Sequence, residues 1–498
     1  MSQDRNRKVL IIGAGIGGLS MAIILARLGF EVTVLEKNQR PGGLMRSYTR
    51  EGLECEVGIH YLGSLDKGQV LRKFFDYLGV TDAIPVTRMG QNGVIDRYVF
   101  DSPDAWPRSF DLPQGMDAYE ENLHQAFPAA GNKISKVMAA LRKAADQLHS
   151  LDLLYARDSD LSLLDQFQPL GEILDELQCP PGLRSILAVP ASWIGVPLDD
   201  CPAFYHNMAL ASYLSSSWRL DCSGADMAEV VAERLRALGG KIITGAEVSR
   251  IEVSSRVVTG LRLSSGEVLA AGMVIGAVHP KVVLNMLPDG AVKPSYRQRI
   301  TGLRDTHGIF SVHARIDGQT HPEIPYNLFK VATDRAGNVP DLKYYQIRKS
   351  NKRDVNILSI LTSGKSEIWR PWENTSTGRR GQTYVDTKER HAWQLVREAG
   401  DMLGNFQDLK ILDVYTPLSM RDWVGSPGGS AYGVQRSASQ ALAAALLNRT
   451  AVQGLFLAGQ NVMAPGIIGA ITGSFATAKL ILGADEFRRQ VHLQEVTG

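Results

Sequence analysis

Residues 9–18 read VLIIGAGIGG, and this stretch decides the fold. Its first four residues are apolar, which is typical of a central parallel strand that is buried on both faces. Three of its glycines, Gly13, Gly15 and Gly18, then stand at G-x-G-x-x-G spacing. In a dinucleotide-binding turn the first glycine permits the tight bend, and the second lets a pyrophosphate approach the backbone. The third lets a helix pack close to the strand.

The residues that follow complete a βαβ unit. A helix is expected over 19–28, and Gly29 ends it before a second apolar strand at 31–35. Glu36 closes that strand, at the place where an acid bonds the ribose hydroxyls of a bound nucleotide. Because a carboxylate there repels a 2′-phosphate, NADP is disfavoured, and NAD and FAD remain open.

Two further glycine-rich segments favour FAD over NAD. Residues 40–44 (RPGGL) place a second glycine pair within reach of the same pyrophosphate. Near the other end of the chain, residues 454–459 predict a buried strand that ends in glycine, and a helix is expected over 467–482. The start of that helix carries no capping side chain, so its amides and positive dipole end suit a reduced, anionic isoalloxazine. The predicted cofactor is therefore FAD.

The composition excludes several other classes of protein. A chain of 498 residues is too long for one compact core, which predicts two joined domains. Lys plus Arg number 54 and Asp plus Glu number 52, so the net charge is +2 and no nucleic-acid partner is expected. The four cysteines form no C-x-x-C pair, which predicts no disulfide framework and no metal site and fits a reducing cytoplasm. The uncharged runs 9–26 and 455–478 are interrupted by glycines or amide side chains, so neither is interpreted as a membrane span.

The middle of the chain predicts the rest of the architecture. Strands are expected at 241–244, 248–253, 257–263 and 274–277. The predicted fold class is α/β: a Rossmann-type FAD-binding domain, with a parallel sheet and helices on both faces, and an inserted mixed α+β substrate-binding domain. The FAD-binding domain is expected to be discontinuous, over 1–80, 215–290 and 415–498, and the substrate-binding domain over 81–214 and 291–414.

The combined pattern resembles the phytoene desaturase family of FAD-dependent oxidoreductases, which includes carotenoid desaturases, carotenoid cis–trans isomerases and retinol saturases. Four stretches carry the resemblance: 9–43, 56–63 (EVGIHYLG), 416–433 and 454–473.

Within that family, two short runs resemble the retinol saturase-like branch most closely. They are Gly58-Ile59-His60-Tyr61 and Gly459-Gln460-Asn461. Two positions depart from the pattern. Ala225 stands where a second glycine is expected, and Asn461 stands where that branch often has an acid.

The resemblance also implies which residues hold the cofactor. The ADP part would be held by the first turn and the strand end that follows it: Gly13, Gly15, Gly17, Gly18, Glu36 and Lys37. The pyrophosphate and the flavin side would be contacted by Arg40, Gly42, Gly43 and Leu44, and the adenine by the backbone of Val248. The ribityl chain and the isoalloxazine would be met by Gly459, Gln460, Asn461, Gly466, Ile467 and Ile468.

The activity implied by the resemblance is oxidoreduction of carbon–carbon double bonds in an apolar, isoprenoid-like small molecule, by saturation, desaturation or isomerisation. His60 and Tyr61 are the candidate catalytic side chains, because they follow Gly58 in a turn expected beside the flavin. His60 could give a proton to one alkene carbon as hydride arrives at its neighbour. A histidine held only by packing is the interpretation that we favour, and Tyr61 is the weaker candidate.

Two other functions are kept open. A flavin amine or amino-acid oxidase would release hydrogen peroxide and carry an aromatic cage at the flavin. A non-catalytic prenyl-protein escort would share the scaffold without FAD, and the complete glycine turn with Glu36 argues against it. An apolar substrate resides in membranes, so a cytoplasmic protein with peripheral membrane contact is expected. The oligomeric state does not follow from the sequence.

Overall fold

The computed structural model describes residues 7–101, 107–155 and 167–493. The first unit forms as predicted: strand β1 (Lys8–Ile12), helix α2 (Ile16–Arg27) and strand β2 (Glu31–Glu36) follow one another. The helix begins at Ile16, earlier than the sequence predicts, because the second half of the glycine turn is already helical.

Five parallel strands form the central sheet, in the order β10-β2-β1-β14-β20. The three further strands are β10 (Lys241–Thr244), β14 (Met273–Gly276) and β20 (Leu455–Leu457). One sheet therefore joins the beginning, the middle and the last part of the chain.

Alternate side chains of β1 enter two separate cores, as the period of a strand requires. Val9 and Ile11 pack with α2, α10 (Gly224–Ala237) and α16 (Gly466–Leu482). Leu10 and Ile12 pack on the opposite face of the sheet. That face is covered by the antiparallel strands β11 (Val248–Ser254), β12 (Val257–Leu263) and β13 (Val268–Ala270) and by the helices α11 (Pro280–Met286) and α12 (Pro294–Thr301). Helices thus lie on both faces, and the α/β fold class is confirmed.

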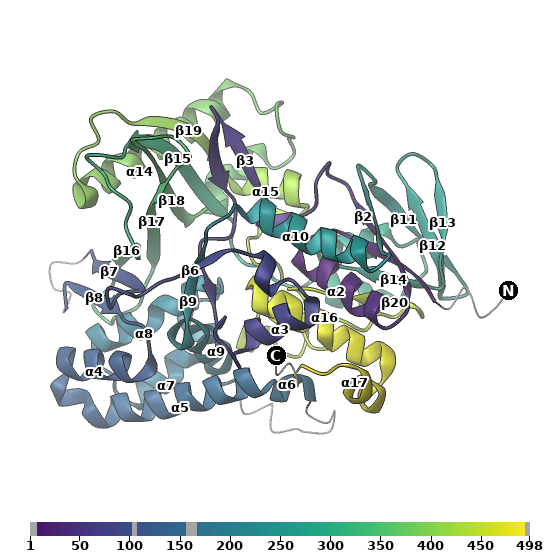
Figure 1. Ribbon diagram of the computed structural model, residues 1–498, viewed down its shortest axis with the longest axis horizontal. Helices are drawn as coiled ribbons and strands as arrows, with labels where there is room; N and C mark the ends of the chain where they lie inside the picture. The colour runs from purple at the N-terminus through teal and green to yellow at the C-terminus, as the bar shows by residue number, and fades with distance from the viewer. Residues whose placement is uncertain (1–6, 102–106, 156–166, 494–498) are drawn as a thin grey trace.

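The second large sheet has seven strands, in the order β19-β15-β18-β17-β16-β7-β8. In chain order they are β7 (Asp96–Phe100), β8 (Ser109–Leu112), β15 (Ile309–Asp317), β16 (Asn327–Ala332), β17 (Asp341–Lys349), β18 (Val355–Ser363) and β19 (Lys410–Tyr415). Only the β7–β16 pair is parallel. This mixed sheet lies at the upper left of Figure 1, beside the parallel sheet.

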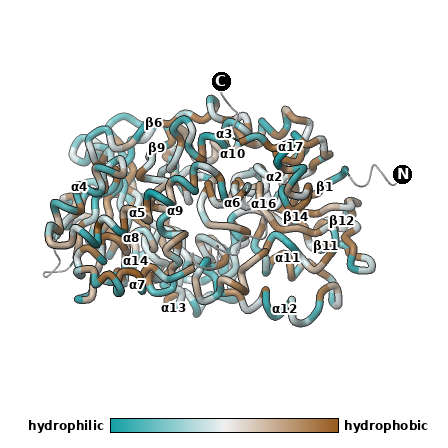
Figure 2. Tube along the Cα trace, turned by 90° about the horizontal axis from the view of Figure 1, so that it is seen from below, coloured by the Kyte–Doolittle hydropathy of each residue, from teal (hydrophilic) through white to brown (hydrophobic). Residues whose placement is uncertain are grey.

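Neighbouring residues of this sheet also face opposite cores. Phe329 and Tyr344 pack against a layer of helices, whereas Leu328 and Tyr345 pack against α14 (Gln382–Leu403). The helical layer consists of α4 (Met116–Ala126), α5 (Gly131–Ser150), α7 (Leu170–Glu176), α8 (Pro181–Trp193) and α9 (Ala203–Ser215). Seen from below in Figure 2, α5, α8 and α14 lie on one side of the molecule and β12 and β14 on the other.

Smaller elements connect the two halves. Strands β5 (Leu62–Gly63), β9 (Ser217–Leu220) and β6 (Val86–Arg88) form a short sheet, and β3 (Ser47–Arg50) pairs with β4 (Leu53–Glu56). The remaining α-helices are α3 (Val70–Leu78), α6 (Asp152–Tyr155), α13 (Ser366–Trp369), α15 (Pro417–Val424) and α17 (Ala484–Gln490).

The predicted division into two domains stays a prediction. The parallel strands fall within 1–80, 215–290 and 415–498, and β7, β8 and β15 to β18 fall within 81–214 and 291–414. Helix α12 lies in the range predicted for the substrate-binding domain, yet its Ile300 is buried in the core beside the parallel sheet.

Within the described residues, no single helix has the length and apolar character that a membrane crossing needs. The pair α16 and α17, which is bent by 117°, meets those two criteria together.

Candidate functional site

The glycine turn after β1 contains glycines that the fold itself requires and one that it does not. Gly13 has a φ of 98°, which residues with side chains rarely adopt, and a Cβ on Gly18 would lie 2.0 Å from Gly13 O. Gly15 differs, because its φ of −72° suits any residue and a Cβ there would have one neighbour within 4 Å, Gly43 Cα at 3.9 Å. The protein itself therefore tolerates a side chain at position 15, and the bare backbone leaves room for a ligand.

A second glycine loop lies against the first. The Gly42 amide donates a hydrogen bond to Ala14 O at 2.8 Å, and a Cβ on Gly43 would come within 3.1 Å of Gly15 Cα. Gly42 and Gly43 have φ angles of 128° and 57°. The two loops predicted from separate motifs thus form one continuous backbone surface.

Glu36 is fixed at the end of β2 beside this surface. The side chain is 5% exposed, and its Oε2 accepts a hydrogen bond of 2.9 Å from the Ala14 amide. Its Oε1 accepts two more, from Asn38 N at 2.9 Å and Asn38 Nδ2 at 2.7 Å. The carboxylate is therefore held beside the glycine turn, where a ribose is expected.

The last part of the chain closes the site from the other side. A Cβ on Gly17 would lie 2.5 Å from Gly459 Cα, so α2 and the end of β20 meet backbone to backbone. Ser474 of α16 donates a hydrogen bond to Gly17 O at 2.8 Å, which fixes α16 against α2. Helix α16 begins at Gly466 and no side chain caps its N-terminus. Its first amides are therefore available to a ligand.

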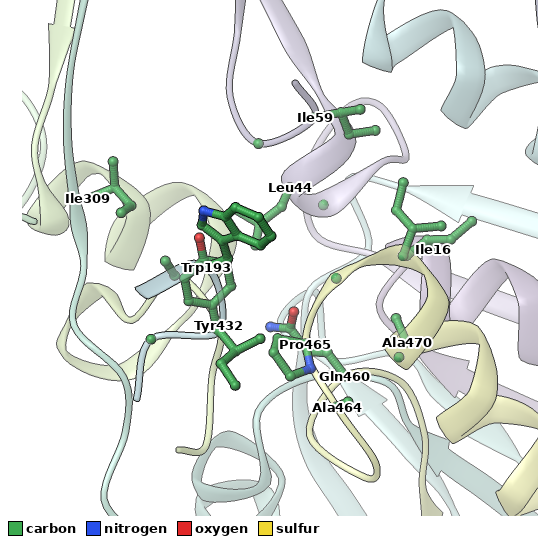
Figure 3. A pocket seen from close by; sticks show the side chains of 18 of the residues that line it. Ile16, Leu44, Ile59, Trp193, Ile309, Tyr432, Gln460, Ala464, Pro465 and Ala470 are labelled. Atoms are coloured by element: carbon green, nitrogen blue, oxygen red, sulfur yellow. The ribbon is translucent and has the colours of Figure 1, made fainter. Parts of the chain in front are cut away.

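A cavity of about 930 Å³ runs between these elements and the part of the molecule that contains the seven-stranded sheet. Backbone of the glycine loops lines one part of it, and mostly apolar and aromatic side chains line the rest. In Figure 3, Trp193 and Tyr432 stand across the cavity from Ile16 and Ala470, with Gln460 and Pro465 between them.

Most of the predicted site residues line this cavity. They are Gly13, Gly15, Gly17, Glu36, Gly42, Gly43, Leu44, His60, Tyr61, Gly459, Gln460, Asn461, Gly466, Ile467 and Ile468. Four do not line it: Gly18, Lys37, Arg40 and Val248. Gly18 serves the packing described above, and Val248 is buried in β11. Lys37 and Arg40 are exposed, and Lys37 Nζ donates to Asp422 O at 3.1 Å.

Arg46 was not among the site residues predicted from the sequence, although it lines the cavity in the region where Arg40 was expected. Its Nε donates to Gly43 O at 3.0 Å, so the guanidinium is tied to the second glycine loop. Burial lowers the pKa of Arg46, and the charge of Glu36 acts in the opposite direction. The short 3-10 helix Gly43–Met45 brings Arg46 back to the loop, and no sequence motif predicts this helix.

His60 and Tyr61 both lie on the cavity wall but differ in their contacts. Neither ring nitrogen of His60 has a hydrogen-bond partner in the described part of the chain, and the ring lies 5.1 Å from that of Tyr344. Burial, with smaller contributions from His313, Arg348 and Arg219, lowers the pKa of His60 to about 3. An imidazole that is neutral at physiological pH agrees with a packing role. Tyr61 stacks on Tyr213 at 4.3 Å, and burial raises its pKa well above the ordinary value.

These residues fit FAD. The bare backbone at Gly15 admits a pyrophosphate, the fixed carboxylate of Glu36 suits a ribose, and the uncapped start of α16 suits the isoalloxazine edge.

Replacing Glu36 by glutamine is expected to weaken FAD binding about 10- to 100-fold. Both carboxylate oxygens now accept backbone or amide N–H groups, and a glutamine would turn an NH₂ toward one set of these donors. A buried donor without an acceptor costs about 1–3 kcal/mol. Flavin fluorescence quenching during titration of apoprotein with FAD measures the effect. Glu31→Gln, at the exposed start of the same strand, is the control, and an unchanged affinity of Glu36→Gln would contradict the assignment.

Comparisons with known proteins agree with this geometry. A family model described as flavin containing amine oxidoreductase matches residues 16–482. The all-trans-retinol 13,14-reductase of Danio rerio is 22% identical in an alignment of 537 positions that covers 97% of this chain and 86% of the reductase. A 4,4′-diapophytoene desaturase of Staphylococcus haemolyticus is 22% identical over 472 residues, which cover 87% of this chain and 89% of the desaturase. Among solved structures, an oxidoreductase from Methanosarcina mazei has a TM-score of 0.65 at 13% identity, covering 95% of this chain and 100% of that one.

These matches bear on four of the predictions made from the sequence. The family match confirms the predicted flavin cofactor, FAD, and the predicted oxidoreductase class. The similarity to a retinol reductase and to a diapophytoene desaturase confirms the resemblance. The solved structure confirms the fold.

Proposed function

We propose that this chain, which belongs to the flavin-containing amine oxidoreductase family, reduces a carbon–carbon double bond of an apolar, isoprenoid-like substrate. The observation that carries this proposal is the cavity, which leads from the glycine loops directly to an apolar chamber walled by aromatic side chains. Trp193, Tyr213 and Tyr432 belong to that wall, and Trp193 and Tyr213 pack edge to face at 5.4 Å. Such a chamber can bury a hydrocarbon chain away from water.

The cofactor would be held by the residues that line the narrow, backbone-walled part of the cavity. We assign the ADP part to Gly13, Gly15, Gly17 and Glu36, the pyrophosphate to Gly42, Gly43 and Arg46, and the flavin side to Leu44, Gly459, Gln460, Asn461, Gly466, Ile467 and Ile468. Bound FAD supplies the electron pair of the reaction. We leave Lys37, Arg40 and Val248 out of this assignment because they do not line the cavity, and Gly18 supports the packing of the turn.

The charges of the cavity favour a neutral substrate over an amine. Two acidic side chains line the described wall, Glu36 and Asp341. Glu36 already accepts three N–H donors and is assigned to the ADP part of the cofactor, and Asp341 lies 3.6 Å from the Lys343 ammonium. Neither carboxylate is free to balance a buried substrate ammonium, and an unbalanced buried charge is strongly unfavourable. The names of the similar proteins, a retinol reductase and a diapophytoene desaturase, support an unsaturated isoprenoid as the substrate.

Anaerobic mixing of the dithionite-reduced holoenzyme with candidate substrates tests the proposal. All-trans-retinol, carotenes and polyprenols are each supplied, and the flavin absorbance and the product mass are followed. The expected result is reoxidation of the flavin with a product that has gained two hydrogen atoms. Oxidised holoenzyme that is reduced by a polyene would instead show desaturation. Hydrogen peroxide release from an amine, with no reaction of any polyene, would overturn the proposal.

We also propose that the protein contacts a lipid surface through the segment 438–448. Leu442 is 81% exposed and Leu446 is 72% exposed, and large apolar side chains in such positions insert into membrane interfaces. A substrate dissolved in lipid would be collected there. The double variant Leu442→Glu and Leu446→Glu is expected to lose most of its cosedimentation with phosphatidylcholine vesicles while detergent-solubilised substrate is still turned over. Equal cosedimentation of variant and parent would contradict this contact, for which Val268→Glu is the control at another exposed apolar residue.

A further inference from the structure

A buried carboxyl group lies behind the cavity wall, next to Tyr61. Asp96 is the first residue of β7 and is 0% exposed. Its Oδ2 lies 3.4 Å from the Tyr61 hydroxyl, and its Oδ1 accepts a hydrogen bond of 2.7 Å from Asn327 Nδ2. Asp96 itself does not reach the cavity, whereas Tyr61 lines it. The tyrosine hydroxyl is thus the group that connects the carboxyl to the substrate space.

The neighbours of Asn327 fix which oxygen of Asp96 carries a proton. Arg219 Nη2 donates to Asn327 Oδ1 at 3.2 Å, and a guanidinium cannot accept a hydrogen bond. The amide nitrogen of Asn327 must therefore face Asp96, its neighbour across the β7–β16 pair. Because Oδ1 already accepts that N–H, a proton on Asp96 resides on Oδ2, the oxygen that faces Tyr61.

The surroundings of Asp96 bring the pKa of this carboxyl close to neutral pH. Burial raises the pKa of Asp96 to about 7, and the hydrogen bonds from Asn327 and Tyr61 and the charge of Arg219 oppose that rise. The titratable or charged groups that face Asp96 are Tyr61, Tyr98, Tyr213, Tyr344 and Arg219. Below pH 7 the neutral carboxyl donates to the Tyr61 oxygen, which leaves the tyrosine proton free to point into the cavity. Above pH 7 the carboxylate accepts that proton instead.

We propose that Tyr61 is the catalytic proton donor to the substrate carbon and that Asp96, acting through Tyr61, is its positioning residue and proton reserve. This inference rests on the proposed function. Bound reduced FAD would supply the hydride, with its electron pair, to one carbon of the double bond, and Tyr61 gives its proton to the neighbouring carbon. The Asp96 proton moves to the Tyr61 oxygen in the same event, so no free phenolate forms. Asp96 is left as a carboxylate and regains a proton from solvent before the next turnover.

Three variants test the relay in the holoenzyme. Asp96→Asn keeps the shape and can still accept from Asn327, but it has no proton to transfer. It is expected to lower the rate constant of substrate reduction about 100-fold with little change in KM, which is the scale of general acid catalysis. Tyr61→Phe is expected to lower the rate constant of substrate reduction at least as much. Tyr98→Phe is the matched control, because it removes a buried hydroxyl without a partner in the described structure, on the same strand as Asp96 and outside the cavity.

The pH profile separates proton transfer from mere packing. The wild-type rate is expected to fall above pH about 7 as Asp96 ionises, and the Asp96→Asn profile is expected to be flat in that range. An Asp96→Asn variant that keeps both the wild-type rate and the inflection would overturn the relay while leaving the proposed function intact.

Infrared difference spectra give a readout that does not depend on turnover. The carbonyl band of a protonated carboxyl should disappear between pH about 6 and about 8 in the wild type. Burial also raises the pKa of Glu56 to about 7, so the part of the band that is absent from Asp96→Asn assigns the proton to Asp96. If no polyene is reduced by any variant, the proposed function fails, and these spectra still decide the protonation of Asp96. Identical bands in wild type and Asp96→Asn would show that Asp96 does not carry this proton.

Discussion

A Gly15→Val variant is expected to fold normally and to be purified without its yellow cofactor. The backbone at Gly15 has a φ of −72°, and the nearest neighbour of a Cβ there is Gly43 Cα at 3.9 Å. The protein therefore accommodates the new side chain, but FAD does not, because its pyrophosphate is expected in the space that the side chain fills. FAD affinity should fall at least about 100-fold, which corresponds to about 2.7 kcal/mol. Titration of the apoprotein with FAD and thermal unfolding of the apoprotein measure the two effects separately.

Two other glycines make this experiment specific. Gly400 lies within α14 with an ordinary φ and one nearby atom at 3.5 Å, so Gly400→Ala should change neither FAD affinity nor folding. Gly18→Ala should disturb folding itself, because its Cβ would lie 2.0 Å from Gly13 O. If Gly15→Val bound FAD as tightly as wild type, the assignment of the pyrophosphate to this turn would be wrong.

Phe475→Ala is expected to produce the largest loss of stability among the changes considered. The side chain is 0% exposed on α16, and its ring centroid lies 5.1 Å from that of Phe74 and 5.2 Å from that of Tyr77. Removing a fully buried phenylalanine ring lowers the free energy of unfolding by about 3–5 kcal/mol. The transfer free energy of the ring is lost, and a cavity remains where the ring made packing contacts. Since these contacts anchor α16, we expect FAD release at a lower denaturant concentration. Urea unfolding followed by flavin fluorescence and circular dichroism measures both.

The control for this variant is Phe406→Ala in the other half of the molecule. Phe406 is half-buried and packs on His321 at 4.6 Å, so its truncation should cost much less and leave the flavin signal unchanged. A Phe475→Ala protein with the stability of Phe406→Ala would show that α16 is not anchored by this aromatic cluster.

The parts of the fold that local patterns encode were predicted well. The β1-α2-β2 unit follows from apolar runs and one glycine turn, all within residues 8–36. The seven-stranded sheet could be predicted only as a mixed domain, because its pairings depend on distant segments. Asp96 of β7, for example, pairs with Asn327 of β16. No local pattern of residue types specifies which strands far apart in the chain become neighbours.

The candidate site shows the same limit on a smaller scale. The glycine loops could be predicted to lie together because their arrangement depends on the backbone, which the motif spacing describes. Arg40 and Arg46 could not be told apart, since the direction of each side chain depends on the turn after Gly42. Asp96 was missed altogether, because it belongs to a strand with no motif and acquires its role only through contacts with Tyr61 and Asn327.

The contact between Gly17 and Gly459 also determines when the protein can acquire its cofactor during synthesis. The nucleotide-binding turn leaves the ribosome early, but β20 and α16, which complete the sheet and close the site, are made hundreds of residues later. A nascent chain that stops before α16 therefore has half a cofactor site with an open flank. The complete cofactor site therefore exists only once the chain has been made as far as residue 482.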